Sequence, residues 1–140
     1  MKFQRRDFLK STAAAALAGS STFGALGLAL AADPVNFFAW SAGVDQVKAH
    51  ISAFEAKTGI KVNYGNAPWA QYRDTLVTKF VGKAPLDVLW VSDAWLPEWA
   101  EAGWLAPIDG YPQLLKYNAE VDEFSTKSMM WKGKQYGLTY

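Results

Sequence analysis

Short apolar segments alternate with longer amphipathic segments between residues 35 and 92, and this alternation restricts the possible folds more than any other feature. Residues 35–40, 60–64 and 87–92 are β-prone runs of strand length that are bounded by turn residues. The interior of the third run is wholly apolar, as expected for a parallel strand that is covered on both faces. Strands separated by helices build βαβ units. The sequence therefore predicts an α/β fold.

Helices are predicted between and after these strands. Four apolar residues of the first helical segment recur at spacings of three, four and three: Val44, Val47, Ile51 and Phe54. They form one face of an amphipathic helix that ends at Gly59. Further helices are predicted over residues 68–81 and 97–102, and residues 111–124 are expected to be helical in part. Residues 129–138 are expected to form a strand, a tight turn and a second strand.

The first 31 residues are typical of an export signal. Four basic residues against one acidic residue precede a long uncharged run that is rich in Ala, Gly and Ser. Small residues at Ala29 and Ala31 predict cleavage after Ala31, so that residues 1–31 are a signal peptide and residues 32–140 are the mature chain. The alternative is a membrane anchor, because the uncharged run is long enough to cross a bilayer. Its Ala and Gly content and the processing signal favour cleavage.

Residues 4–10, Gln-Arg-Arg-Asp-Phe-Leu-Lys, resemble the twin-arginine (Tat) motif, which directs folded proteins to export. A weakly hydrophobic run after the motif fits the same route, because a more hydrophobic run tends to enter the Sec pathway. The alternative is an ordinary Sec signal that contains two arginines. Either route predicts a protein outside the cytoplasm.

Charge and cysteine content exclude several classes of function. Removal of residues 1–31 takes away four positive charges and one negative charge, which changes the net charge from +1 to −2 and argues against nucleic acid as a partner. The chain has no cysteine, which excludes disulfides, Fe–S clusters and a lipid-anchored cysteine. A protein without such an anchor needs an outer membrane to retain it, so we expect a Gram-negative periplasm. His50 is the single histidine, and no cofactor motif is present, so neither a metal nor a cofactor is expected.

Four passages, in the correct order, are similar to those of bacterial extracellular solute-binding proteins. Residues 54–62 resemble the passage F-E-K-x-T-G-I-K-V, and residues 87–92 resemble the third strand of the family. Residues 96–109 resemble L-x-x-A-x-x-G-x-L-x-P-L-D. Residues 131–138 resemble x-x-G-K-x-Y-G-L, and Thr139 then stands where the family usually has Pro. The resemblance covers residues 35–140.

The resemblance implies a periplasmic binding protein-like, two-lobe (type II) α/β fold in which ligand binds between the lobes. The chain stops inside an expected strand at Tyr140, so we expect it to contain only most of the first lobe, with the sheet completed by later sequence. The implied function is the substrate-binding component of an ABC importer that delivers a carbohydrate or polyol to its permease. The full-length protein is expected to be a monomer and not an enzyme.

Other ligands and one other class remain as alternatives. Polyamines need several convergent carboxylates, ferric iron needs tyrosines with a carboxylate or histidine, and small anions need arginines or helix N-termini. Arg73 is the only arginine after the signal peptide. A Tat-exported periplasmic enzyme is the alternative from another class, and the absence of cysteine and of a cofactor motif argues against it.

Ligands of open α/β sheets bind outside the carboxyl ends of the strands, and this position selects the candidate site residues. They follow the first, second and third strands or lie near the crossover to the second lobe: Trp40, Ser41, Asn66, Trp69, Asp93, Trp95, Tyr136 and Tyr140. Sugars present an apolar C–H face and a rim of hydroxyls, which suits flat aromatic rings with polar side chains around them. The alternatives are core packing for the tryptophans and a helix N-cap for Asp93. Trp90, Trp99 and Trp104 are assigned to the core.

Overall fold

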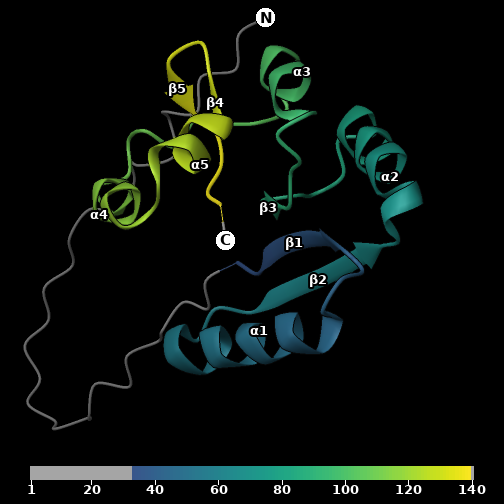
Figure 1. Cartoon of the computed structure of the whole chain (residues 1–140). Helices are drawn as coiled ribbons and strands as arrows, with labels where there is room; N and C mark the ends of the chain where they lie inside the picture. Colours follow the sequence, from purple (N-terminus) through teal and green to yellow (C-terminus); the bar gives the residue numbers. More distant parts are fainter. Residues whose placement is uncertain (1–32, 140) are drawn as a thin grey trace, which may run out of the picture. The chain divides into compact units, whose positions relative to one another are not determined.

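The structure is a computed structural model that describes residues 33–139, so the predicted signal peptide and Tyr140 lie outside the described residues. The elements follow one another in a βαβαβ pattern, then three helices and a hairpin (Figure 1): β1 Val35–Trp40, α1 Val44–Thr58, β2 Val62–Ala67, α2 Trp69–Val81, β3 Val88–Leu89, α3 Leu96–Glu101, α4 Gln113–Glu120, α5 Glu123–Ser128, β4 Met130–Trp131 and β5 Lys134–Gln135. The predicted α/β class is confirmed.

The first three strands form a parallel sheet in the order β2-β1-β3. All six residues of β1 pair with β2, from Val35 opposite Val62 to Trp40 opposite Ala67. On the other side, Phe37 pairs with Val88 of β3. β1 is therefore the central strand of the described sheet, and the carboxyl ends of β1 and β2 reach the same edge.

β3 is shorter than the predicted strand over residues 87–92. The backbone ladder runs from Asp87 N, which donates to Asn36 O at 2.9 Å, to Trp90 N, which donates to Phe38 O at 3.1 Å. The next carbonyl, Trp90 O, instead accepts a hydrogen bond from the Tyr72 hydroxyl at 2.7 Å. A side chain from α2 thus contacts the chain just after the regular strand ends at Leu89.

The core of the lobe lies between the sheet and the helices α2 and α3. It consists of five buried residues from β1, β2, α2 and α3: Phe38, Ala67, Tyr72, Leu76 and Trp99. The rings of Phe38 and Tyr72 are stacked with centroids 5.7 Å apart. Trp99 is fully buried, which confirms its assignment to the core, and Trp90 and Trp104 pack against the cluster.

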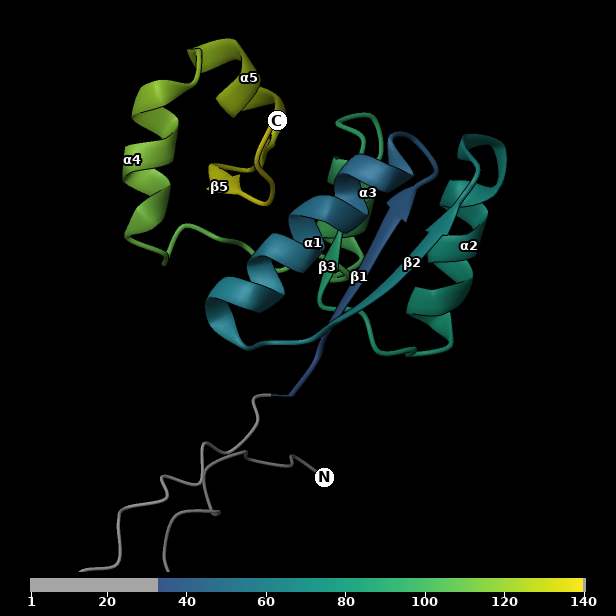
Figure 2. The same ribbon diagram turned by 90° about the horizontal axis from the view of Figure 1, so that it is seen from below.

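α1 runs alongside β1 and β2 (Figure 2) and has the predicted bounds, with Gly59 in the left-handed conformation (φ 74°) at its C-terminus. None of its residues is fully buried. Its apolar face is only partly covered, since Phe54 remains 42% exposed. None of the helices within residues 33–139 has the length and apolar content that a bilayer-spanning segment needs.

The C-terminal part of the described chain holds two short helices and a hairpin. The segment predicted to be partly helical forms α4 and α5, which are separated at Asp122, whose carboxylate accepts a hydrogen bond from Ser125 N at 2.9 Å. β4 and β5 pair antiparallel across a two-residue turn in which Lys132 and Gly133 both have positive φ. That conformation is the type I′ turn of tight hairpins, as predicted, although each strand has only two residues.

Candidate ligand-binding site

The predicted polar residues after β1 and at the end of β2 meet at the carboxyl edge of the sheet. The Ser41 hydroxyl donates to Asn66 Oδ1 at 2.9 Å, and both side chains are exposed. The backbone holds them together, because Ser41 N also donates to Ala67 O at 2.9 Å. This pair offers a hydroxyl group and an amide group at one point of the sheet edge.

The three predicted tryptophans gather at the same edge. Trp69 is the first residue of α2 and Trp95 immediately precedes α3. Their rings are stacked, with centroids 5.0 Å apart and an angle of 23° between the planes. The ring of Trp40 meets Trp69 edge to face, at 5.2 Å and 85°. The end of β1, the start of α2 and the turn before α3 therefore contribute to one aromatic cluster.

These tryptophans differ in exposure. All seven tryptophans of the chain lie within residues 33–139, and Trp69 is the only exposed one, with 56% of its surface accessible. Trp95 is half-buried because its ring also contacts Trp99 at 5.4 Å. Trp40 is half-buried as well and contacts Trp90 at 4.8 Å. Trp69 thus has the greatest accessible ring surface, and Trp40 and Trp95 link it to the core.

Tyr72 supports this cluster, although it was not among the candidate site residues selected from the sequence. It is fully buried, and its ring contacts Trp40 at 5.5 Å and Trp95 at 6.3 Å. Its hydroxyl lies 2.7 Å from Trp90 O and 3.1 Å from Phe38 O, and its single hydrogen is shared between these two carbonyls. A tyrosine at this position anchors the aromatic cluster to β1 and to the end of β3. In the sequence, the one indication of this role is that Tyr72 follows Trp69 by three residues.

Asp93 lies in the turn between β3 and α3 and is exposed. Its Oδ1 accepts hydrogen bonds from Ala94 N at 2.8 Å and from the Ser92 hydroxyl at 3.1 Å. The N-cap of α3 is Trp95, without a side-chain cap, so the alternative of an N-cap role for Asp93 is wrong. Asp93 instead stabilises the turn that leads into the helix.

Tyr136 is half-buried just after β5, and its N donates to Met129 O at 2.9 Å. Within residues 33–139 no ring contact links Tyr136 to the tryptophans, so the structure does not bring it into the aromatic cluster. Tyr140 lies outside the described residues. The structure thus joins three of the eight candidates, Trp40, Trp69 and Trp95, by ring contacts, and joins two others, Ser41 and Asn66, by a hydrogen bond.

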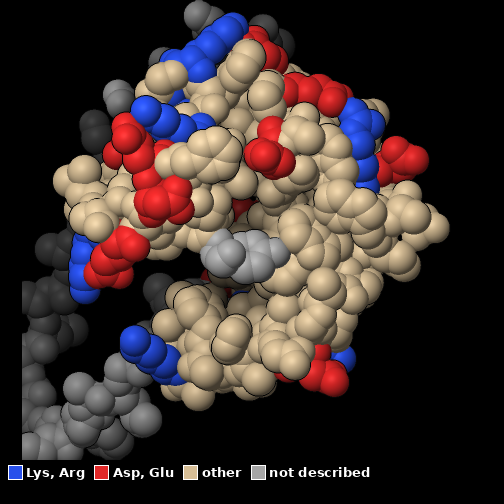
Figure 3. Space-filling view, in the orientation of Figure 1, with Lys and Arg blue, Asp and Glu red and all other residues tan. Residues whose placement is uncertain are grey.

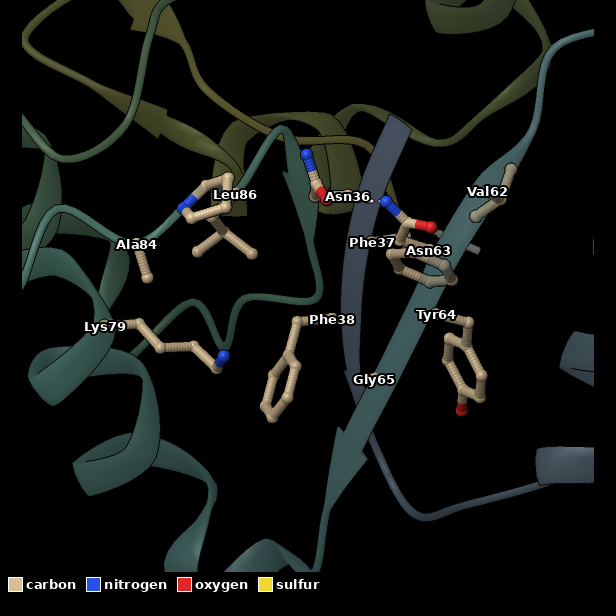
Figure 4. A pocket seen from close by; sticks show the side chains of 11 residues that line it. Asn36, Phe37, Phe38, Val62, Asn63, Tyr64, Gly65, Lys79, Ala84 and Leu86 are labelled. Atoms are coloured by element: carbon tan, nitrogen blue, oxygen red, sulfur yellow. Dashed lines mark hydrogen bonds between the residues drawn. The ribbon is translucent and has the colours of Figure 1, made fainter. Parts of the chain in front are cut away.

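One cavity of the described chain lies elsewhere. It has a volume of about 590 Å³ and extends along the amino-terminal part of β1 and β2 to the end of α2. Figure 4 shows Asn36, Phe38 and Lys79 among its lining residues, with the Lys79 ammonium near the Phe38 ring, 4.9 Å from its centroid. Ligands of open α/β sheets bind at the opposite, carboxyl end of the strands. We therefore place the candidate site at the aromatic cluster.

Charges are dispersed in the described part of the chain. On the face that Figure 3 shows, acidic and basic side chains are interspersed and form no broad basic patch. No three His, Asp or Glu side chains within residues 33–139 converge on a point where a metal ion would be held. The local character of the candidate site is aromatic, with a few polar groups around it.

A parallel sheet with helices against it and an aromatic cluster at its carboxyl edge is the architecture of an α/β lobe. Residues 38–140 match the bacterial extracellular solute-binding proteins, and the chain belongs to this family. Residues 2–21 match the signal sequence of the twin-arginine translocation pathway. The predictions of the family and of the Tat signal are both confirmed, and the protein is exported to the periplasm.

Solved structures with the same fold are sugar-binding and solute-binding proteins. The GacH receptor of Streptomyces glaucescens is 25% identical, with a TM-score of 0.68 over 76% of this chain and 28% of its own. The sugar-binding protein MalE of Xanthomonas citri is 25% identical, with a TM-score of 0.66 over 74% of this chain and 27% of its own. An ABC transporter solute-binding protein of Thermotoga lettingae is 26% identical, with a TM-score of 0.64 over 76% of this chain and 28% of its own.

The similarity confirms the periplasmic binding protein-like fold. The chain spans little more than a quarter of the length of these three proteins. No curated protein sequence matches the chain.

Proposed function

We propose that this protein is the substrate-binding component of an ABC importer and that it captures a carbohydrate or polyol for delivery to the membrane permease. The observation that carries the proposal is the exposed ring of Trp69, which is stacked on Trp95 at the carboxyl edge of the sheet. The Ser41–Asn66 pair lies at the end of the two adjacent strands.

The chemistry of this edge suits a sugar. A pyranose or furanose ring has a C–H face that packs on an indole, while its hydroxyls need donors and acceptors at the rim. Trp69 supplies the flat surface, and its neighbours Trp40 and Trp95 restrict its motion through ring contacts at 5.2 and 5.0 Å. Ser41, Asn66 and Asp93 supply exposed polar groups on adjacent connections. Tyr136 and Tyr140 remain candidate contacts from the crossover.

Two of the similar proteins support a carbohydrate ligand. The GacH receptor of Streptomyces glaucescens was solved in complex with acarbose, and the Thermotoga lettingae protein was solved with α-D-tagatose. A polyamine site would need several carboxylates, whereas Asp93 is the only acidic residue among the candidates. Within residues 33–139, no three His, Asp or Glu side chains converge as ligands for a ferric ion. Arg73, the only arginine of these residues, is already paired with Glu98.

The proposal extends to the organisation of the mature protein. Cleavage after Ala31 releases a chain whose residues 32–140 form most of the first of two lobes, and ligand binds between the lobes. Lobe closure then presents the loaded protein to the permease. The full-length protein acts as a monomer by capture and release, binds no nucleic acid and catalyses no reaction.

A fluorescence titration of the full-length protein tests the ligand class. Tryptophan emission should be quenched or shifted by acarbose or α-D-tagatose, because the sugar packs on exposed indole, and it should not respond to spermidine. A response to spermidine alone would contradict the carbohydrate proposal.

Substitution of Trp69 tests the site. Trp69→Ala should weaken binding of the responding sugar by about 2 kcal/mol, roughly 30-fold, as is typical of a central aromatic contact. The matched control is Phe124→Ala, which removes an aromatic ring that is 84% exposed on α5. If Trp69→Ala binds the sugar as tightly as the parent protein does, the binding site does not lie at this edge of the sheet.

A further inference from the structure

Two contacts between α2 and α3 lie one helical turn apart. Trp69 and Arg73 are separated by four residues on α2, and Trp95 and Glu98 are separated by three residues at the start of α3, so each pair lies on one helix face. Trp69 stacks on Trp95, and Arg73 forms an ion pair with Glu98. The aromatic stack and the ion pair are therefore adjacent bridges between the same two helices.

The ion pair uses both oxygens of the carboxylate. Arg73 Nη2 lies 2.8 Å from Glu98 Oε1 and 2.6 Å from Glu98 Oε2. The side chains are 39% and 53% exposed, so water screens the attraction and the pair adds little to the stability of the fold. Its loss should leave the lobe folded and act locally.

The other contacts between α2 and α3 show where along the two helices Trp69 and Trp95 need a further restraint. Further along, the ring of Phe80 meets the buried ring of Trp99 at 5.3 Å, so core packing joins the helices there. At the other end, neither α2 nor α3 has a side-chain N-cap. Uncapped first turns fray most readily, and both Trp69 and Trp95 belong to such a turn. The Arg73–Glu98 pair lies between these uncapped ends and the core.

We infer that Arg73 and Glu98 are positioning residues that hold Trp69 stacked on Trp95 and so keep the outer face of Trp69 oriented for a carbohydrate ring. The guanidinium group suits this task because it stays charged at any physiological pH and keeps a planar donor geometry. The effect on sugar binding rests on the proposed function, whereas the effect on the stacking of Trp69 on Trp95 does not.

The experiment compares variants of the full-length protein by two measurements. Circular dichroism without ligand reports the exciton coupling of stacked indoles, and Trp69→Ala identifies the part of that signal that Trp69 contributes. Titration with acarbose and α-D-tagatose gives the affinity. Arg73→Met and Glu98→Gln should each reduce the Trp69 signal and weaken sugar binding up to about fivefold, the upper value for an exposed pair.

A charge swap and a matched control separate positioning from general damage. The double variant Arg73→Glu/Glu98→Arg should recover the Trp69 signal and the affinity, because it rebuilds the pair with opposite polarity. Glu123→Gln breaks another exposed pair, in which Lys127 Nζ lies 2.7 Å from Glu123 Oε1 on α5, and should change neither measurement. If Glu123→Gln has the same effect as Arg73→Met, the positioning role is wrong.

The remaining outcomes distinguish this inference from the proposed function. If the parent protein binds a sugar and Arg73→Met matches it in both signal and affinity, the positioning role is wrong and the proposed function stands. If the parent protein binds neither sugar, the dichroism alone decides the inference. A reduced Trp69 signal that the swap restores then supports it, and an unchanged signal overturns it.

Discussion

The ring of Phe38 lies directly across the bare backbone of Gly65 on the neighbouring strand. The two residues are register partners in β1 and β2, and a Cβ atom on Gly65 would lie 2.8 Å from Cδ2 and 3.0 Å from Cε2 of the phenylalanine ring. Phe38 cannot yield easily, because its ring is buried and stacked on Tyr72. The absence of a side chain at Gly65 therefore allows the core ring to lie close to the backbone of β2.

Gly65→Ala should accordingly lower the free energy of unfolding by about 1–3 kcal/mol, the usual cost of overpacking a core. Chemical denaturation of the full-length protein measures the change. The control is Gly110→Ala, because a Cβ there would meet no atom within 4 Å. Equal stability of Gly65→Ala and the parent protein would show that Phe38 has room to move.

Asp87→Asn should reduce stability at neutral pH and make it less dependent on pH below about 4. The Asp87 carboxylate accepts hydrogen bonds from Asn36 N and Asn36 Nδ2, both at 2.8 Å, and these bonds hold its pKa below the ordinary value of 3.8. A depressed carboxylate pKa stabilises the fold above 3.8, and this contribution is lost as the pH falls through the folded-state value. Denaturation series at several pH values measure both effects.

The control for Asp87→Asn is Asp74→Asn, which removes an exposed negative charge from α2. It separates the bonds to Asn36 from the change in net charge. A stability of Asp87→Asn that falls with acid as steeply as that of the parent protein would contradict the assignment.

Replacement of the paired arginines, Arg5-Arg6→Lys-Lys, should block export while the protein still folds in the cytoplasm. The match of residues 2–21 to the Tat signal motivates this prediction. Lysine keeps the positive charge that a Sec signal needs but lacks the planar guanidinium group of arginine. Fractionation of cells that produce each version measures the periplasmic yield, and an unchanged yield would assign the signal to the Sec route.

Residues 32–140 expressed alone should be poorly stable and should not capture ligand. Apolar side chains remain exposed on several elements, and α1 has no fully buried residue. β2 and β3 each pair with β1 only within the described residues, so the sheet has unpaired edges that favour aggregation. Denaturation and sugar titration beside the full-length protein test this. A cooperatively unfolding fragment that binds sugar equally well would contradict the two-lobe proposal.

Local chemistry determined much of this protein from sequence alone. Residues 35–40 form a strand and residues 44–58 a helix with the predicted bounds, because apolar periodicity and a terminal glycine are properties of the neighbouring chain. Lys132 and Gly133 form the predicted tight turn for the same reason. The family and the Tat signal were also recognisable, since both depend on short motifs in a fixed order.

Contacts between distant residues were decided only by the tertiary structure. The predicted third strand ends early, at Leu89, and the Tyr72 hydroxyl, from another element, binds the next carbonyl, Trp90 O. The sequence placed Trp40, Trp69 and Trp95 at the same edge of the sheet, but only folding showed that Trp69 is the most exposed and that the other two support it. Burial and ring geometry depend on which side chains approach across the sheet, and no local pattern contains that information.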